Sequence, residues 1–419
     1  MTQPRGSREY GVLLLGATGY TGTLTANHIA RYLPRDLKWA LGGRSKARLD
    51  NLATNLKVQF PERVPPDVVE IVSFDNRGSL ASAVRRAQVC ISIISYTAVG
   101  EAVIQACVQN GTDYVDAWDV RAAIPPLLHT WTEKYHQSAS DAGVVLVHAC
   151  GASVAPMDIL VQAAVRKIET GWSMKTKEIT LSIDHSSMKL SAGTVETMLH
   201  LATMKRSRLR EAESPEALSP VKVPTASHSP KMGQHPILGL LSPSSFLAEQ
   251  NRALINRTWG LLHGTETEYG PNFQYHEYQK ATSKMAGKGL VLQKHALNTM
   301  LGLVRLAPVR YILQRVSPEP STGPDDEGAS VVIDAIATAD TTSTQQIPSL
   351  HVHFSYPHGV YQLTALCLAQ GAASLFYDRK LVGNWRGGCL TPALLGSDML
   401  ERIQRAGVVI KITPVASKP

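Results

Sequence analysis

A glycine-rich turn behind a short apolar segment constrains the fold more than any other feature of the sequence. Residues 12–15 form a continuous apolar run, which is typical of a strand buried on both faces of a parallel sheet. The turn that follows has its glycines at GxxGxxG spacing and consists of Gly16, Ala17, Thr18, Gly19, Tyr20, Thr21 and Gly22. Such glycines permit a tight turn, a close approach of the backbone to pyrophosphate, and close packing of the next helix on the strand. Because a helix N-terminus offers free N–H groups to phosphate, the segment predicts a dinucleotide-binding domain.

Strand-like segments recur at regular intervals after this turn. We expect strands at 38–41, 68–74, 89–94, 114–116 and 144–147, separated by helices such as 101–110, which ends at Gly111. Strands that alternate with helices predict a doubly wound parallel sheet, with its ligand crevice at the carboxyl ends of the strands. The fold class is therefore α/β, with an N-terminal Rossmann domain at 1–150.

The pattern changes after residue 150. Strands are expected at 178–184 and 330–337, whereas 205–236 and 317–328 are rich in Ser, Pro and charge and are expected to be loops. We interpret 151–359 as a mixed α+β domain for substrate binding and dimerisation. Helices at 361–370 and 398–406 and a strand at 408–412 predict that the segment 360–419 returns to the Rossmann domain.

The end of the second predicted strand indicates which dinucleotide binds. An NAD enzyme places a carboxylate there, but residues 42–46 contain none and include Arg44, Ser45 and Lys46. A guanidinium beside a hydroxyl suits a 2′-phosphate, so NADP(H) is the predicted cofactor. Asp75 and Asn76 are placed to meet the adenine, although Asp75 can equally be a turn former.

Two residues are candidates for a proton donor. No Tyr-x-x-x-Lys pair follows the fourth strand, which disfavours the short-chain dehydrogenase mechanism. Ser95 and Tyr96 come after that strand, on the expected nicotinamide side, and His148 ends the sixth strand. Tyr96 and His148 can each supply a proton, and His148 can alternatively be a structural histidine.

Other potentially reactive side chains favour structural interpretations. His351 and His353 share one face of a strand, but without an acidic or cysteine partner at ligand spacing they indicate a polar strand face and no metal site. Cys150 is expected to be a buried thiol, since no adjacent cation would lower its pKa.

Composition narrows the possible partners and location. The net charge is +8, but the basic run at 205–210 lacks interleaved aromatic residues, so nucleic-acid binding is not expected. Five scattered cysteines and the lack of an apolar leader predict a reducing, cytoplasmic setting. The segment 297–316 is apolar but contains three arginines, so it should either pack on the core or lie on a membrane surface.

Several ordered segments resemble the saccharopine dehydrogenase-like oxidoreductases, a family that includes the trans-acting enoyl reductases of polyketide-derived lipid synthesis. The similar segments are LLLGATGYTG (13–22), WALGGRS (39–45), GTDYVD (111–116), HACGASVAPMD (148–158), SAGT (191–194), 268–278 and 387–407. The resemblance implies a Rossmann domain completed by the C-terminal tail, a second domain inserted before the tail, and NADPH-dependent reduction. It implies that Gly16 and Thr18 to Gly22 hold the pyrophosphate, that Arg44 and Ser45 hold the 2′-phosphate, and that Ser95 and Tyr96 border the nicotinamide.

The chain departs from the family pattern at 117–120 and at Ala152-Ser153, where a substrate pocket is expected. The leading hypothesis is an NADPH-dependent reductase of a C=C or C=N bond in a small, fairly apolar metabolite. One alternative is a non-catalytic NADP-binding protein that docks on a partner synthase or a lipid surface, and another is a saccharopine-type amino-acid dehydrogenase. The expected partners are a small-molecule substrate, a partner synthase or a membrane surface, and a second copy of the chain in a homodimer.

Overall fold

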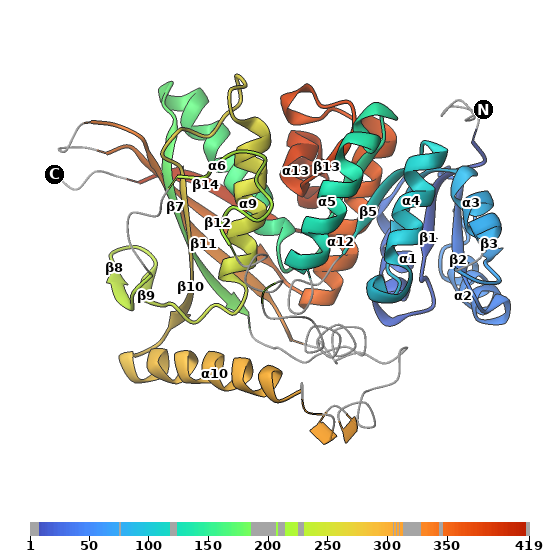
Figure 1. Ribbon diagram of the computed structural model, residues 1–419, viewed down its shortest axis with the longest axis horizontal. Coiled ribbons are helices and arrows are strands. Elements are labelled where there is room, and N and C mark those ends of the chain that lie inside the picture. The colour runs from blue at the N-terminus through green and yellow to red at the C-terminus, as the bar shows by residue number, and fades with distance from the viewer. Residues whose placement is uncertain are drawn as a thin grey trace.

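A computed structural model describes residues 8–74, 77–117, 124–185, 207, 214–224, 230–304, 306, 308–309, 311–312, 328–342 and 347–415. These residues form two seven-stranded sheets with helices packed around them, shown in Figure 1. Sheet A contains the strands before residue 150 and one strand at Gly388–Leu390, and sheet B contains the other strands.

Sheet A has the strand order β13-β6-β5-β4-β1-β2-β3, and its pairings are parallel. Its strands are β1 (Tyr10–Leu15), β2 (Trp39–Gly43), β3 (Asp67–Glu70), β4 (Ala87–Ser92), β5 (Asp113–Asp116), β6 (Val145–Val147) and β13 (Gly388–Leu390). The connecting helices are α1 (Tyr20–Tyr32), α2 (Lys46–Gln59), α3 (Arg77–Arg85), α4 (Glu101–Asn110) and α5 (Ile124–Asp141). The predicted doubly wound sheet is confirmed, and the strand order reverses direction between β1 and β4.

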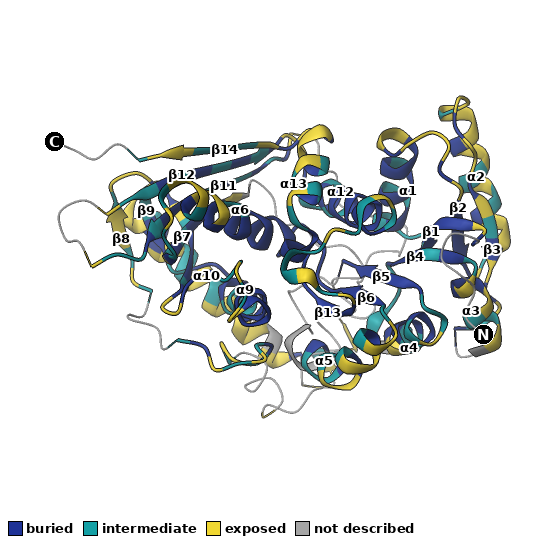
Figure 2. Ribbon diagram, turned by 90° about the horizontal axis from the view of Figure 1, so that it is seen from above, coloured by how far each residue is buried: buried dark blue, intermediate teal, exposed yellow. Residues whose placement is uncertain are grey.

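Alternate side chains of β1 enter two different cores. Val12 and Leu14 pack with α1 and with α12 (Val360–Ala373), whereas Leu13 and Leu15 pack with α3, α4 and α5. Figure 2 shows α1 and α12 on one side of the sheet and α4 and α5 on the other. A helix from the C-terminal part of the chain therefore covers one face of the N-terminal sheet.

Local sequence explains where several elements end. Helix α4 ends at Gly111, which has φ 70°, a left-handed conformation that favours glycine. The strand expected at 68–74 is shorter, because β3 ends at Glu70 and Val72 is 78% exposed. Ile71 and Phe74 remain buried and still anchor this segment to the core.

Sheet B has the order β14-β12-β11-β7-β10-β9-β8, and only the β7–β10 pair of its described pairings is parallel. Its strands are β7 (Thr176–His185), β8 (Gly233–His235), β9 (Gly239–Ser242), β10 (Gln274–Ala281), β11 (Val331–Ala339), β12 (Ser349–Tyr356) and β14 (Val409–Pro414). The accompanying helices are α6 (Ala155–Trp172), α9 (Ala248–Leu262), α10 (Lys284–Leu303) and α13 (Gly396–Arg405). The stretch 205–236, expected to be entirely loop, ends in the short strand β8, which forms a hairpin with β9.

The C-terminal part of the chain contributes to both sheets. Strand β13 pairs with β6 in sheet A, and β14 pairs with β12 in sheet B. Short helical turns at Ser374–Asp378 and Val382–Asn384 precede β13, and the turn at Pro392–Leu395 and helix α13 lie between β13 and β14. Within the described residues, no helix has the length and apolar character needed to cross a membrane.

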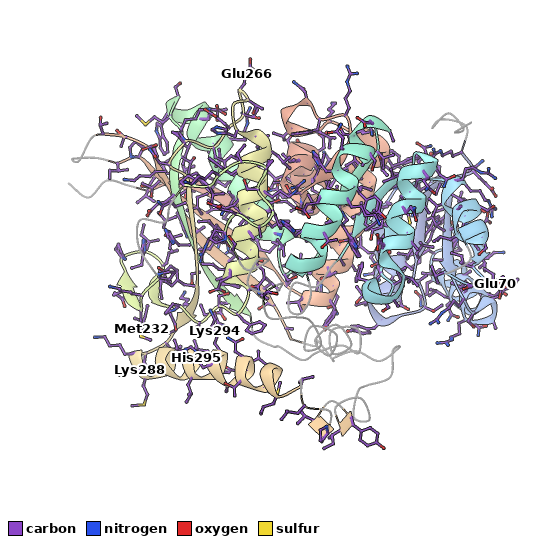
Figure 3. All side chains as sticks on the ribbon, viewed as in Figure 1. Glu70, Met232, Glu266, Lys288, Lys294 and His295 are labelled. Carbon is purple, nitrogen blue, oxygen red and sulfur yellow. The ribbon has the colours of Figure 1, made fainter. Side chains whose placement is uncertain are left out.

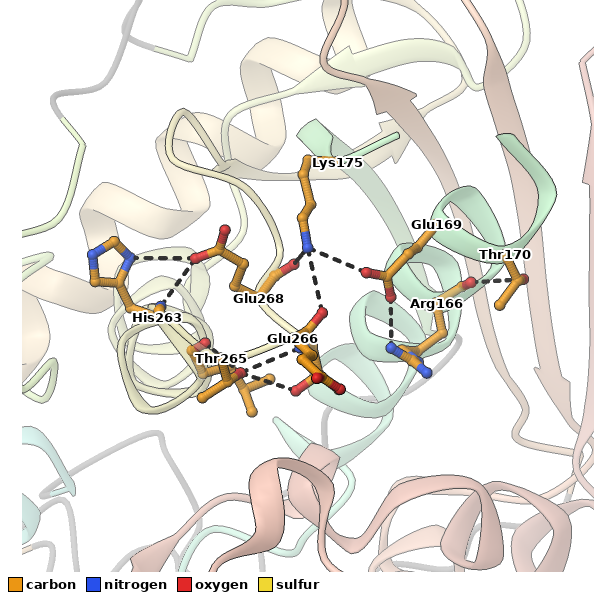
Figure 4. Close-up of polar contacts among 11 residues, drawn as sticks. Arg166, Glu169, Thr170, Lys175, His263, Thr265, Glu266 and Glu268 are labelled. Carbon is orange, nitrogen blue, oxygen red and sulfur yellow. Dashed lines mark hydrogen bonds and ion pairs between the residues drawn. The ribbon is translucent and has the colours of Figure 1, made fainter. Parts of the chain in front are cut away.

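A cluster of hydrogen bonds and ion pairs connects the end of α6 to the loop between α9 and β10, as Figure 4 shows. Lys175 Nζ lies 3.2 Å from Glu169 Oε1 and donates to the carbonyl oxygens of Glu266 and Glu268 at 3.5 and 3.1 Å. Arg166 pairs with the other carboxylate oxygen of Glu169 at 2.5 Å. The cluster lies at the surface and orders this loop.

Candidate cofactor and active site

The glycine turn connects β1 to α1 at the point where the strand order reverses. Gly16 has φ 83°, and Gly19, the residue before α1, has extended backbone and no side-chain cap. A helix N-terminus without a side-chain cap suits an anionic ligand such as a phosphate. The predicted start of the helix immediately after Gly19 is confirmed.

The three glycines of the turn have different surroundings. A Cβ at Gly16 would lie 2.3 Å from the carbonyl oxygen of Ile93, and one at Gly22 would lie 2.1 Å from that of Gly16. A Cβ at Gly19 would meet only Gly16 O, at 3.5 Å. Gly16 and Gly22 are thus required for packing, whereas the open space at Gly19 suits the approach of a pyrophosphate.

The carboxyl end of β2 presents a cation and no carboxylate. Arg44 is exposed, and Ser45 immediately precedes α2 without capping it through its side chain. Lys46 points its ammonium to Asp50 Oδ2 at 2.8 Å, so this lysine already has an anionic partner. The arrangement fits the 2′-phosphate of NADP(H), with Arg44 as the available cation.

The end of β4 lies beside the glycine turn and carries the candidate residues of the nicotinamide side. Ser95 precedes a π-helical turn at Tyr96–Gly100, and both Ser95 and Tyr96 are half-buried. The Tyr96 hydroxyl donates to the Ser92 carbonyl oxygen at 2.8 Å and accepts from the Ala117 N–H at 3.3 Å. These bonds connect the ends of β4 and β5. Asp75 and Asn76 lie outside the described residues.

His148 forms a buried pair with Asp116, at the ends of β6 and β5. His148 Nδ1 lies 2.6 Å from Asp116 Oδ2, and Asp116 Oδ1 accepts from the Ala149 N–H at 2.8 Å. Ala149 has φ 57°, an unfavourable conformation for alanine that the carboxylate holds in place. Burial acts to lower the pKa of His148, but the charge and hydrogen bond of Asp116 outweigh it and raise the pKa to about 9. The Asp116 carboxylate thus favours the protonated form of His148.

A second polar group beside His148 was not found by sequence reasoning. Cys389 lies on β13 and is buried. Arg257 donates to the carbonyl oxygen of Cys389 at 2.5 Å, and the N–H of Cys389 donates to His136 Nδ1 at 3.1 Å. Burial acts to raise the pKa of the Cys389 thiol, but the neighbouring His136, His148 and Arg257 lower it to about 7. These residues come from distant segments, and no local spacing relates them.

Asp158 is a buried carboxylate near the start of α6. It accepts from Thr258 Oγ1 at 2.7 Å and from the Ala393 N–H at 2.9 Å, and Thr258 Oγ1 also contacts Thr391 Oγ1 at 2.7 Å. Burial raises the pKa of Asp158 to about 6 despite these donors. The contacts join α6, α9 and the segment after β13.

The other sequence candidates have mixed outcomes. Cys150 is buried as predicted, and burial raises its pKa well above the ordinary value. The expectation that His351 and His353 lack an acidic partner is wrong, because both contact Asp334 Oδ1 across the strand pair, at 3.0 and 2.9 Å. Asp334 lies on β11, and sequence spacing alone cannot show that it faces β12. Over the described part of the chain, no group of His, Cys, Asp and Glu suits a metal ion.

Comparison with known proteins found a matching family model and several similar proteins. Residues 12–147 match the family model described as the saccharopine dehydrogenase NADP binding domain. A trans-acting enoyl reductase of Mycobacterium bovis (strain BCG / Pasteur 1173P2) is 27% identical over 434 residues, covering 97% of this chain and 98% of that protein. One of Mycobacterium leprae (strain TN) is 27% identical over 436 residues, with the same coverage of both chains. Among solved structures, AtPrR2 in apo form aligns with 33% of this chain and 48% of its own, at 20% identity and a TM-score of 0.26.

The turn at β1, the cation at β2 and the family match all concern the same domain and the same cofactor. The chain is an NADP-dependent oxidoreductase, and its residues 12–147 are similar to the saccharopine dehydrogenase NADP binding domains.

Proposed function

We propose that the chain uses NADPH to reduce a C=C or C=N bond of a small, fairly apolar metabolite of specialised or lipid metabolism. The observation that carries the proposal is the position of Tyr96, whose hydroxyl lies at the end of β4, next to the strand that leads into the glycine turn. The names of the mycobacterial relatives favour an enoyl substrate. When bound, the cofactor supplies the hydride, and the protein orients it against the substrate.

We further infer which residues bind each part of the cofactor. Gly16, Ala17, Thr18, Gly19, Tyr20, Thr21 and Gly22 bind the pyrophosphate. Arg44 and Ser45 bind the 2′-phosphate, Asp75 the adenosine end, and Ser95 with Tyr96 the nicotinamide end. The C-terminal helix α12 also reaches this turn, since the rings of Tyr20 and Tyr361 are 5.3 Å apart in an edge-to-face contact.

Of the two candidate proton donors, Tyr96 is favoured over His148. The side chain of His148 is only 2% exposed, so it has little access to a substrate. Tyr96 is half-buried. Its hydroxyl forms hydrogen bonds with two backbone groups, and these bonds fix the position of the ring. His148 and Asp116 then act by holding the ends of β5 and β6 in place.

The partners belong to the same proposal. The relatives are named trans-acting, so a partner synthase is the proposed source of the substrate. We also propose that the protein contacts a membrane peripherally and that it forms a homodimer. The division into 1–150, 151–359 and 360–419 is likewise proposed, with substrate specificity residing in the middle segment.

The experiment is to follow NADPH consumption by the purified chain with a panel of enones, 2-enoyl thioesters and cyclic imines. In a separate assay with NADP+ and saccharopine, NADPH formation is followed. Turnover of an enone or imine supports the proposal, and turnover of saccharopine alone supports the amino-acid dehydrogenase alternative. NADPH binding without turnover across every class supports the non-catalytic alternative. That alternative is motivated by the departures from the family pattern at 117–120 and 152–153.

A further inference from the structure

Helix α10 is attached to sheet B along one face. Ser242 Oγ donates to the Gly287 carbonyl oxygen at 3.0 Å, and a Cβ at Gly287 would come within 3.0 Å of Met232 Cε. Lys294 Nζ lies 3.4 Å from Glu249 Oε1, and its side chain is 17% exposed. Figure 1 shows α10 at the periphery of the molecule, and Figure 3 labels Met232, Lys288, Lys294 and His295 in this region.

The opposite face of α10 carries an apolar stripe that faces solvent. Met285, Leu292, Met300 and Leu303, here called the outer stripe, are 84%, 70%, 44% and 48% exposed. Because an α-helix has about 3.6 residues per turn, positions 285, 292 and 303 lie on one line along the helix, with 300 beside it. A surface helix normally turns such a stripe towards the core. Here the contacts of Gly287 and Lys294 hold the other face inward.

The charged side chains of α10 itself are all basic. Lys284 and Lys288 are exposed, and His295 is exposed on the same helix. Between residues 284 and 318 the sequence contains no Asp or Glu, whereas Lys284, Lys288, Lys294, Arg305, Arg310 and Arg315 are basic. An exposed apolar stripe flanked by cations is the pattern of a helix that lies in the headgroup region of an anionic bilayer.

We propose that α10 docks this protein on an anionic membrane surface. The outer stripe enters the boundary between headgroups and acyl chains, and Lys284 and Lys288 lie at the level of the lipid phosphates. The absence of acidic residues from 284 to 318 favours this occupant, because anionic headgroups attract a basic segment that has no carboxylate to repel them. The inference deepens the membrane contact that forms part of the proposed function and rests on that part, but it does not depend on the substrate.

The test is flotation of the NADPH-loaded, full-length protein with vesicles of phosphatidylcholine alone or mixed with phosphatidylserine. We expect binding to the mixed vesicles, weak binding to the neutral ones, and release at high salt. The double variant Leu292→Asp/Leu303→Asp should lose affinity by about tenfold or more, since two apolar contacts become charged. Val58→Asp is the matched control, because Val58 is a 75% exposed apolar residue on α2, and it should bind like the wild type.

Three results would overturn the proposal. They are no binding to anionic vesicles, equal binding by the double variant, and self-association without lipid that the double variant abolishes. The last result would assign the stripe to a second copy of the chain. Circular dichroism and NADPH binding check that each variant is folded. If the double variant does not fold, Lys284→Glu/Lys288→Glu serves instead and should also lose binding to the anionic vesicles.

Discussion

His148 Nδ1 lies 2.6 Å from Asp116 Oδ2, and both side chains are buried at the ends of adjacent parallel strands. This pair holds the turn after β6, because the same carboxylate also accepts from the N–H of Ala149. A buried ion pair contributes little net stability, but removal of one partner leaves an uncompensated charge.

Asp116→Asn should therefore lower the free energy of unfolding by about 3–5 kcal/mol. The measurement is urea unfolding at pH 7 followed by circular dichroism. Asp50→Asn is the control, since Asp50 forms an exposed pair with Lys46, and its loss should leave the urea midpoint unchanged. Equal midpoints for Asp116→Asn and the wild type would show that His148 is not charged in the folded protein.

The pH dependence of stability should reveal the pairing of His148 with Cys389. The pKa of His148 is raised from 6.5 to about 9, so its contribution is complete below pH 6.5 and is lost as pH rises towards 9. The pKa of Cys389 is lowered from 9.0 to about 7, so its contribution has the opposite sign and is lost as pH falls towards 7. In the wild type the loss of stability from His148 and the gain from Cys389 largely cancel as pH rises from 7 to 9.

Cys389→Ala removes one of the two trends. The variant should lose roughly 2 kcal/mol of stability between pH 6.5 and 8.5, because one pKa unit corresponds to about 1.4 kcal/mol. Urea unfolding at several pH values measures this slope. Adding His148→Asn to the variant should flatten the curve again, and a slope that persists in the double variant would assign the titration to another group.

Much of the N-terminal sheet can be predicted from sequence, because its signals are local. An apolar run, a glycine turn and the glycine that ends α4 each lie within a few residues, and the strands of sheet A follow at regular intervals. The roles of Gly16 and Gly22 also follow from their spacing, although only the structure identifies the carbonyl groups that they avoid.

The rest depends on contacts between distant segments. Strand β13 has three residues, too few for a periodic signal, yet it extends sheet A beside β6 and brings Cys389 towards His148. Asp334 meets two histidines only through the register of β11 and β12. Sequence reasoning placed His148 at a strand end, but it could not show that Asp116 lies against its ring and raises its pKa.

Alanine substitutions at two glycines of the turn should have different effects, one on stability and the other on cofactor binding. Gly22→Ala places a Cβ 2.1 Å from the Gly16 carbonyl oxygen, and this clash should cost about 1–3 kcal/mol or more. Gly19→Ala meets only ordinary contact at 3.5 Å, so it should fold normally but bind NADPH weakly, because the methyl group occupies the proposed phosphate position. Thermal unfolding and nicotinamide fluorescence measure the two effects.

The control for the glycine variants is Gly171→Ala, near the end of α6, where an added Cβ meets nothing within 4 Å. It should be neutral or stabilise the protein by about 0.5–1 kcal/mol. If Gly19→Ala binds NADPH as tightly as this control, the turn does not hold the pyrophosphate.

Arg44 should determine the preference between the two nicotinamide cofactors. Arg44→Ala is expected to weaken NADPH binding by about tenfold to a hundredfold, the effect of losing a charge-assisted hydrogen bond, and to leave NADH binding nearly unchanged. Titration by nicotinamide fluorescence gives both dissociation constants. Arg48→Ala, at an exposed position on α2, serves as the control. Equal losses for NADPH and NADH would remove Arg44 from the 2′-phosphate site.

Tyr96→Phe tests the proposed proton donor with little change of shape. The variant keeps the ring and removes the hydroxyl that donates to the Ser92 carbonyl oxygen at 2.8 Å and accepts from the Ala117 N–H at 3.3 Å. If the hydroxyl protonates the substrate, kcat should fall by about a hundredfold or more, while the dissociation constant of NADPH stays the same. Tyr32→Phe, at a 48% exposed position on α1, should leave both quantities unchanged. A loss of NADPH binding or of thermal stability in parallel with kcat would instead make Tyr96 a positioning residue that joins β4 to β5.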